Sequence, residues 1–348
     1  MKRRSLMLAV IVTLILTACQ NNIGDSALVE TGMTAIENGQ YNDALTLFQK
    51  AVSEEKDLIR AYRGQGLSYM GMEDYENAVK SFDQALERTS DKMENIKKDI
   101  LYYKAAALYK QDDFTGTISV CDDILRIAEE GDAYYLRGTG YLECGEDDKA
   151  KENFDAAVSL QPGDYDLYLN IYESYREKKR SADGDVYLQD ALNIESKDEE
   201  SAYQKARIYY YLGNNEEAKD EILTMAENKQ ADAMLLLGKI YLAMEDAAHS
   251  RNIYEQYMAE YGETLEAYNG VVLADIAEEN YEAALENIQK GLALAAEEED
   301  KQELYFNEIV VYERQYNFAA AKEKALEYKN RYPWDEAGQR EYEFLQTR

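Results

Sequence analysis

One spacing pattern occurs in two long stretches of this 348-residue chain. Both stretches, residues 62–86 and 134–162, begin with tyrosine and continue with glycine four residues later and tyrosine three residues after that. Alanine, phenylalanine and a second alanine follow after nine, four and three residues, giving Tyr62, Gly66, Tyr69, Ala78, Phe82 and Ala85 in the first set and Tyr134, Gly138, Tyr141, Ala150, Phe154 and Ala157 in the second. Spacings of three and four place residues on one helix face, and the nine-residue interval spans a turn. Each stretch therefore predicts a helical hairpin.

This pattern resembles the tetratricopeptide repeat, whose period is 34 residues. The small residue at the eighth position of that repeat can be followed along most of the chain at steps of 32 to 39 residues. These markers are Gly32, Gly66, Ala105, Gly138, Tyr172, Ala206, Gly238, Val272 and Ile309. The only two prolines, Pro162 and Pro333, occupy the position where the family places a helix-ending proline. The match is weaker in the fifth, seventh and eighth units, where Tyr172, Ser250 and Asp275 replace the usual residues.

The resemblance implies an all-α fold, because a single hairpin cannot bury its own apolar face and stacked hairpins share one core. We expect a right-handed superhelical solenoid of about nine hairpins over residues 25–333. Residues 334–348 are expected to form a capping helix over the last hairpin.

The N-terminus reads as an export signal. Three basic residues at positions 2–4 precede an apolar run over 5–18 that is shorter than the ~20 residues a membrane-spanning helix needs. The following Leu16–Cys19 segment, "LTAC", resembles the lipobox of bacterial lipoproteins. That resemblance implies cleavage of residues 1–18, lipidation of Cys19 and a short tether over residues 19–24. An ordinary secretory signal with a chance cysteine is the alternative.

Charge restricts the partners of the exported chain. Loss of the three cationic leader residues would move the net charge from −31 to −34, which disfavours nucleic acid and anionic lipid headgroups. Membrane attachment is therefore expected to depend on the acyl anchor alone. The predicted location is the extracytoplasmic face of the cell membrane, or an outer membrane where the organism has one.

Residues with catalytic or metal-binding chemistry are few. His249 is the single histidine and is expected at an exposed surface, and the sequence contains neither Cys-x-x-Cys nor His-Glu-x-x-His. Cys121 occupies a core position and Cys144 a turn, so we expect no disulfide between them, although an exported chain could form one. The sequence therefore predicts a non-enzyme without cofactor or metal.

The family resemblance implies a partner-binding groove lined by the first helix of each hairpin. An aromatic and apolar lining is typical of surfaces that bind proteins or peptides. The positions expected to line it are Tyr102, Tyr103, Tyr109, Tyr135, Leu136, Leu142, Asn170, Tyr203, Arg207, Tyr210, Tyr211, Leu235, Leu236, Lys239, Leu242 and Asn307. Two alternatives remain open: tight stacking buries these residues against one another, or the repeat register is shifted by one.

These features predict a membrane-anchored, non-catalytic scaffold or adaptor that holds partner proteins. An envelope assembly factor for outer-membrane or pilus biogenesis and a solute or peptide receptor for a transporter are the alternatives. Neither the partner nor the oligomeric state follows from the sequence.

Overall fold

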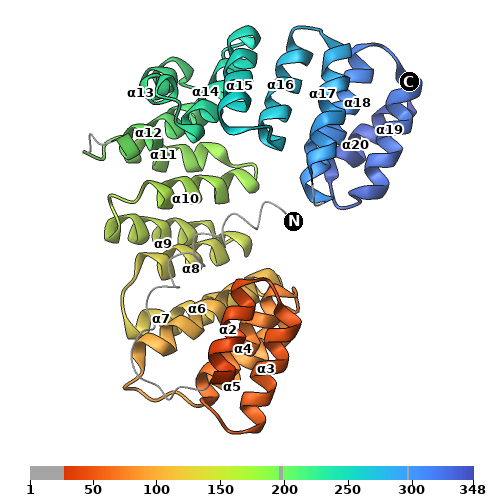
Figure 1. Ribbon diagram of the computed structural model, residues 1–348. Coiled ribbons are helices and arrows are strands. Elements are labelled where there is room, and N and C mark those ends of the chain that lie inside the picture. The colour runs from red at the N-terminus through yellow and green to blue at the C-terminus, as the bar shows by residue number, and fades with distance from the viewer. Residues whose placement is uncertain (1–26, 196–198, 296–297) are drawn as a thin grey trace. The chain divides into compact units, whose positions relative to one another are not determined.

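A computed structural model describes residues 27–195, 199–295 and 298–348. Within these ranges the chain forms nineteen α-helices and one short 3₁₀ helix, η1, with no strand (Figure 1). The chain divides into two compact units, which are described separately: unit 1 extends to Leu188, and unit 2 runs from Gln189 to Arg348.

Unit 1 consists of antiparallel helices that pack against their neighbours in chain order. The helices are α2 (Ala27–Glu37), α3 (Tyr41–Ser53), α4 (Leu58–Gly71), α5 (Tyr75–Leu86), α6 (Glu94–Lys110), α7 (Phe114–Ile127), α8 (Gly131–Glu143), α9 (Asp147–Leu160), α10 (Tyr165–Glu177) and most of α11 (Ser181–Ala191).

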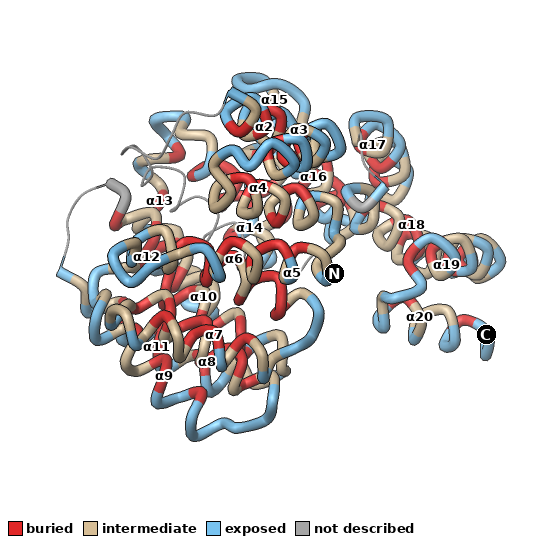
Figure 2. The backbone as a smooth tube through the Cα atoms, turned by 90° about the horizontal axis from the view of Figure 1, so that it is seen from below, coloured by how far each residue is buried: buried red, intermediate tan, exposed pale blue. Residues whose placement is uncertain are grey.

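Unit 2 continues the same alternation of helices. Its elements are α12 (Glu199–Tyr211), α13 (Asn215–Glu227), α14 (Ala231–Ala243), α15 (Ala247–Tyr261), α16 (Leu265–Ala277), α17 (Tyr281–Leu294), η1 (Glu299–Lys301), α18 (Gln302–Arg314), α19 (Phe318–Arg331) and α20 (Glu336–Gln346). Along the described chain, α2 to α19 form nine consecutive pairs, and α20 packs against α19. Buried residues lie within the helices, and most residues of the turns between them are exposed (Figure 2).

Every hairpin reverses direction through one residue in the left-handed backbone conformation. In the second hairpin, the amides of Glu73 and Asp74 donate to the carbonyls of Met70 and Tyr69 at 3.0 and 2.9 Å, which satisfies the end of α4. The Asp74 carboxylate then accepts from the amide of Asn77 at 3.2 Å and caps α5. The left-handed residues of the nine hairpin turns are Gly39, Glu73, Asp112, Gly145, Lys179, Gly213, Glu245, Glu279 and Tyr316.

Glycines on first helices make room for an aromatic ring from a second helix. In unit 1, Phe48 of α3 lies between Gly32 of α2 and Gly64 of α4, and a methyl group at Gly32 would come within 2.7 Å of the ring. Gly66 and Gly138 lie in the same way against Phe82 and Phe154. Close packing of the two helices of a hairpin therefore accounts for both glycines.

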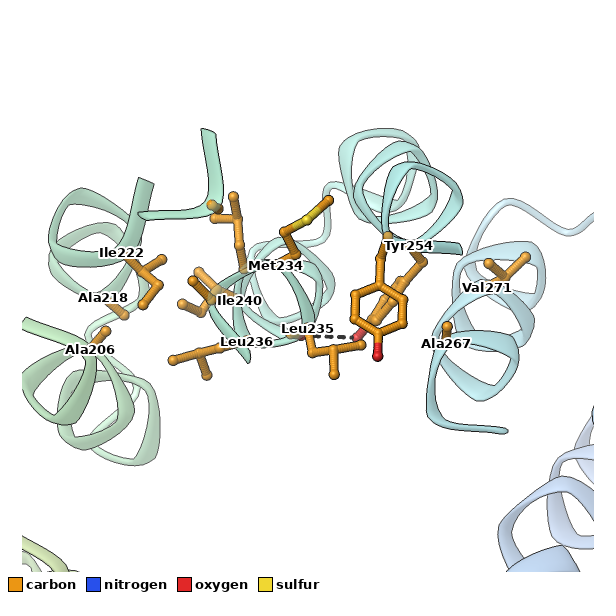
Figure 3. Close-up of a cluster of buried hydrophobic side chains, with 14 residues drawn as sticks. Ala206, Ala218, Ile222, Met234, Leu235, Leu236, Ile240, Tyr254, Ala267 and Val271 are labelled. Atoms are coloured by element: carbon orange, nitrogen blue, oxygen red, sulfur yellow. Dashed lines mark hydrogen bonds between the residues drawn. The ribbon is translucent and has the colours of Figure 1, made fainter. Parts of the chain in front are cut away.

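Tyr254 repeats this arrangement in unit 2. Its ring lies between Gly238 of α14 and Gly270 of α16, and its hydroxyl donates to the Leu235 carbonyl at 3.4 Å (Figure 3). Only 1% of Tyr254 is exposed, so the ring fills the space that α14, α15 and α16 leave between them. We call this packing site the aromatic joint.

The next packing site along unit 2 is polar. Asp275 of α16 is fully buried, forms an ion pair with Arg251 of α15 and accepts a 2.8 Å hydrogen bond from the Asn287 side chain of α17. Glu278 also pairs with Arg251, at 2.5 Å. Burial raises the pKa of Asp275 despite its cationic neighbour. We call this cluster the polar joint.

The expected all-α class, with repeated hairpins and a final helix, is confirmed. The predicted leader over residues 1–18 and the Cys19 tether lie outside the described residues. No helix in the described ranges has the length and apolar composition needed to cross a membrane.

Candidate partner-binding surface

The sixteen residues predicted to line a groove divide evenly by burial. Eight are buried within the chain, namely Tyr102, Tyr103, Tyr109, Tyr135, Leu136, Leu142, Leu235 and Leu236. Among the other eight, Lys239 is exposed, and those half-buried are Asn170, Tyr203, Arg207, Tyr210, Tyr211, Leu242 and Asn307. Burial of the first group agrees with the tight-stacking alternative, and a role for these residues in partner binding stays a prediction.

The buried tyrosines of α6 and α8 have specific contacts inside unit 1. Tyr102 donates its hydroxyl to Glu130 at 2.7 Å, Tyr103 stacks on Phe82 with ring centroids 6.0 Å apart, and the Tyr135 hydroxyl lies 3.5 Å from that of Ser174. Burial raises the pKa of Tyr102 well above its usual range. Its hydroxyl therefore stays protonated at neutral pH and acts as a hydrogen-bond donor.

The half-buried residues of α12 form an aromatic and cationic group in unit 2. The guanidinium of Arg207 lies 5.9 Å from the ring centre of Tyr203 and donates to the Gln204 side chain at 2.6 Å. Tyr210 and Tyr211 lie next to each other, with ring centroids 5.8 Å apart. These side chains combine apolar area with hydrogen-bonding groups, which suits recognition of a polypeptide.

A chain of polar contacts connects the first helices α14, α16 and α18. Lys239 pairs with Glu266 at 2.5 Å, linking α14 to α16. The side-chain amide of Asn269 donates to Glu303 at 2.8 Å, and the amide of Asn307 donates to Asn269 at 2.7 Å, linking α16 to α18. These contacts place the three helices side by side with one polar face in common.

Asn269, Glu266 and Glu303 were not predicted from the sequence. The eighth unit departs from the repeat pattern at Val272 and Asp275, which obscures which α16 side chains share the face of Asn307. The recurrence of acidic residues at steps of 32 to 37 residues, near the start of successive first helices, would have located two of the three.

Two carboxyl groups meet where α18 faces α20. Burial and a hydrogen bond with Glu341 raise the pKa of Glu313 to about 7, although Arg314 and Arg348 oppose the shift. This pair is therefore partly protonated near neutral pH.

The thiols and the histidine occupy ordinary positions. Cys121 is buried, Cys144 is exposed, and both are free thiols. Burial raises the pKa of the Cys121 thiol, which makes it unreactive. His249 is exposed, as expected, and pairs with Asp246 at 2.7 Å. Across the described residues, no group of three or more His, Cys, Asp or Glu side chains is arranged to hold a metal ion.

Comparison with protein families identifies the repeats. Residues 63–133 match one tetratricopeptide-repeat model, and residues 131–164 and 199–224 match another. The helical hairpins that lie in these ranges therefore match tetratricopeptide repeats. These matches indicate no enzyme family.

Individual relatives are distant. The DnaJ homolog subfamily C member 7 homolog of Dictyostelium discoideum is 24% identical over an alignment 256 residues long, which covers 69% of this chain and 46% of that protein. This chain therefore spans less than half the length of that curated relative.

Solved structures of similar chains are also distant. A tetratricopeptide repeat protein from Parabacteroides merdae is 14% identical with a TM-score of 0.48, over 72% of this chain and 98% of that one. A Pseudomonas aeruginosa structure named for pilF is 18% identical with a TM-score of 0.38, over 62% of this chain and 96% of that one.

Proposed function

We propose that this protein is a non-catalytic scaffold or adaptor that binds partner proteins through the first helices of its tetratricopeptide repeats. The observation that carries the proposal is the half-buried group Tyr210, Tyr211 and Leu242, which lies on two successive first helices of unit 2. Tyrosine and leucine side chains in such a position supply contact area at low conformational cost.

Capture of partners tests this role. Proteins crosslinked to the intact chain in native membranes are compared with those crosslinked to the Tyr210→Ala, Tyr211→Ala, Leu242→Ala triple variant. The three residues are only half-buried, so the helical content of the variant is expected to stay that of the parent, which circular dichroism checks. A Tyr316→Ala, Leu326→Ala variant is the control, because both side chains are exposed and lie on other elements of unit 2.

The proposal requires one or a few envelope proteins to be captured by the parent and the control and lost from the triple variant. Identical capture profiles for the parent and a folded triple variant would contradict it. If the captured proteins are outer-membrane or pilus components, the result would favour a function as an envelope assembly factor.

We further propose that the protein is attached to the extracytoplasmic face of the membrane through acyl chains on Cys19. The support is the resemblance of "LTAC" to a lipobox after an apolar run. Incorporation of a labelled palmitate analogue into the parent chain, and its absence from Cys19→Ala, is the expected result. Equal labelling of the two, or no labelling of the parent, would overturn this part of the proposal.

A further inference from the structure

The face shared by α14, α16 and α18 in unit 2 carries apolar side chains that the unit leaves accessible. Leu273 of α16 is 38% exposed, and Leu242 of α14 and Val310 of α18 are half-buried. We call these three residues the apolar band. Leu273 lies four residues after Asn269 and Val310 three residues after Asn307, so each shares a helix face with the asparagine whose hydrogen bonds link α16 to α18.

A row of carboxylates borders this band. The second residue of each of the three helices is acidic and exposed, and we call Asp232, Glu266 and Glu303 the acidic row. Leu273 follows Glu266 by seven residues and Val310 follows Glu303 by seven, so about 10 Å of helix separates the row from the band on α16 and α18. On α14, Leu242 follows Asp232 by ten residues, which is about 15 Å of helix. A partner seated here would meet negative charge on one side and apolar groups on the other.

Most of the row's charge is left uncompensated. Lys239 pairs with Glu266, whereas Glu303 accepts from the neutral amide of Asn269. Within the described residues Asp232 forms no ion pair. The face therefore carries net negative charge beside exposed apolar surface.

The acidic second residue recurs beyond these three helices. A first-turn carboxylate also stabilises its own helix through the macrodipole, and the second helices α9, α11, α13 and α17 carry one in that turn. The two sets of helices differ in how regularly the second residue is the acidic one. Six successive first helices, α8 to α18, have an acidic second residue, whereas the paired second helices alternate acidic residues with alanine. The first-helix residues are Asp132, Asp166, Glu200, Asp232, Glu266 and Glu303, and their second-helix counterparts are Asp148, Ala182, Glu216, Ala248, Glu282 and Ala319.

From these observations we propose that the α14–α16–α18 face binds a cationic amphipathic segment of a partner protein, with lysine or arginine on the acidic row and apolar side chains on the apolar band. This inference rests on the proposed function, since it specifies the chemistry of the segment that a scaffold would hold. Charge complementarity selects a basic segment over an acidic one, and the band requires that it also be apolar.

Three synthetic peptides test the specificity: an amphipathic peptide of lysine and leucine, its glutamate and leucine counterpart, and a peptide of lysine and serine without apolar residues. Binding to the purified chain is followed by fluorescence anisotropy. The lysine–leucine peptide is expected to bind at least about tenfold more tightly than either of the others.

Matched variants locate the site. Glu266→Gln with Glu303→Gln removes two charges from the acidic row and is expected to weaken binding of the lysine–leucine peptide about tenfold. Glu255→Gln with Glu282→Gln removes two exposed charges from the second helices α15 and α17 and should change it less than about twofold. Leu273→Ser should also weaken binding, whereas Leu294→Ser, at a 45% exposed position of α17, should not.

Equal weakening by the two glutamine pairs, or equal binding of the lysine–serine peptide, would show general attraction to an acidic protein and overturn the inference. The partner-capture experiment separates this failure from that of the proposed function. If Glu266→Gln with Glu303→Gln retains the native partner while the Tyr210, Tyr211 and Leu242 variant loses it, the scaffold role stands and the cationic segment is rejected.

Discussion

The aromatic joint and the polar joint share the helices α15 and α16 in unit 2 and hold neighbouring helices together by different chemistry. The aromatic joint connects the second helix α15 to the first helices α14 and α16, whereas the polar joint connects the first helix α16 to the second helices α15 and α17. Helix α15 contributes Tyr254 to the aromatic joint and Arg251 to the polar joint. The aromatic joint depends on volume, because two glycines leave room for one ring. The polar joint depends on charge, because a buried carboxylate needs its cation and its hydrogen bond. The first two of the four tests below separate these dependences, and the other two measure polar contacts that are less buried.

Addition of a methyl group to the aromatic joint should have the largest effect. In Gly270→Ala the new Cβ would overlap the Tyr254 ring, which is held on its other side by Gly238 and cannot move away. We expect a loss of about 3 kcal/mol in the free energy of unfolding, the upper end of the cost of overpacking a core. Urea denaturation measures it.

Two comparisons control this prediction. Gly163→Ala should be close to neutral, because no other residue lies within 4 Å of the place its new methyl group would take and its backbone is not left-handed. Tyr254→Leu should cost less in the Gly270→Ala background than in the parent, since the smaller side chain relieves the overlap. Additive effects would contradict a volume-limited joint.

Removal of charge from the polar joint should have the next largest effect. Asp275→Asn keeps the shape of the side chain and loses its attraction to Arg251, so we expect about 2 kcal/mol less stability. Glu278→Gln, the outer partner of the same arginine, should cost less than about 0.5 kcal/mol. If Asp275→Asn leaves the free energy of unfolding unchanged or raises it, the desolvation cost of burying the ion pair equals or exceeds the attraction between the two charges.

The carboxyl pair Glu313–Glu341 is a polar contact without a buried cation, and it should make the docking of α20 sensitive to pH. The folded chain holds a proton on Glu313 more tightly than the unfolded chain does, so this contact stabilises the fold at low pH. That contribution is lost as the pH rises from about 4.5 to about 7. Both side chains are half-exposed, so the total change should not exceed about 1 kcal/mol.

Glu341→Gln isolates this effect. The variant removes one carboxyl group, so the stability of α20 should vary less with pH across this window than in the parent. Hydrogen exchange of α20 amides, corrected for the intrinsic pH dependence of exchange, measures the difference. Parallel pH profiles for the two chains would reject the contact as the cause.

Removal of an exposed ion pair should have the smallest effect. Lys239→Ala breaks the contact with Glu266, but both side chains are largely exposed, so stability should change by less than about 0.5 kcal/mol. A larger loss on thermal unfolding would show that the polar chain across α14, α16 and α18 acts cooperatively.

The two joints also show how far the sequence predicts the fold. The pairing of a glycine with an aromatic ring is visible in the sequence, because Gly66 and Gly138 precede Phe82 and Phe154 at the same spacing. This periodicity predicted the hairpins. The polar joint was visible only as a departure from the pattern at Asp275, since Arg251 and Asn287 belong to neighbouring helices. Pairing between repeats is a property of packing, which spacing along one helix does not encode.

The candidate surface was less predictable for a related reason. Periodicity identifies the face of a helix, and the resemblance to the repeat family implies that the face with Leu242 and Asn307 is the inner one. Periodicity does not determine how closely adjacent first helices approach, and this distance decides whether residues such as Tyr102 and Leu235 are exposed or buried. Burial therefore had to come from the structure.

The left-handed residue at each hairpin turn has a consequence for how such a chain changes in length. Because one backbone conformation, set by one residue, reverses every hairpin, no turn depends on the helices beyond its own pair. Gene duplication or loss of a whole 34-residue segment would rejoin the chain at equivalent positions and leave every remaining turn intact. Evolution can therefore change the number of hairpins by one whole hairpin at a time. Each added hairpin needs only new side-chain packing against its neighbours.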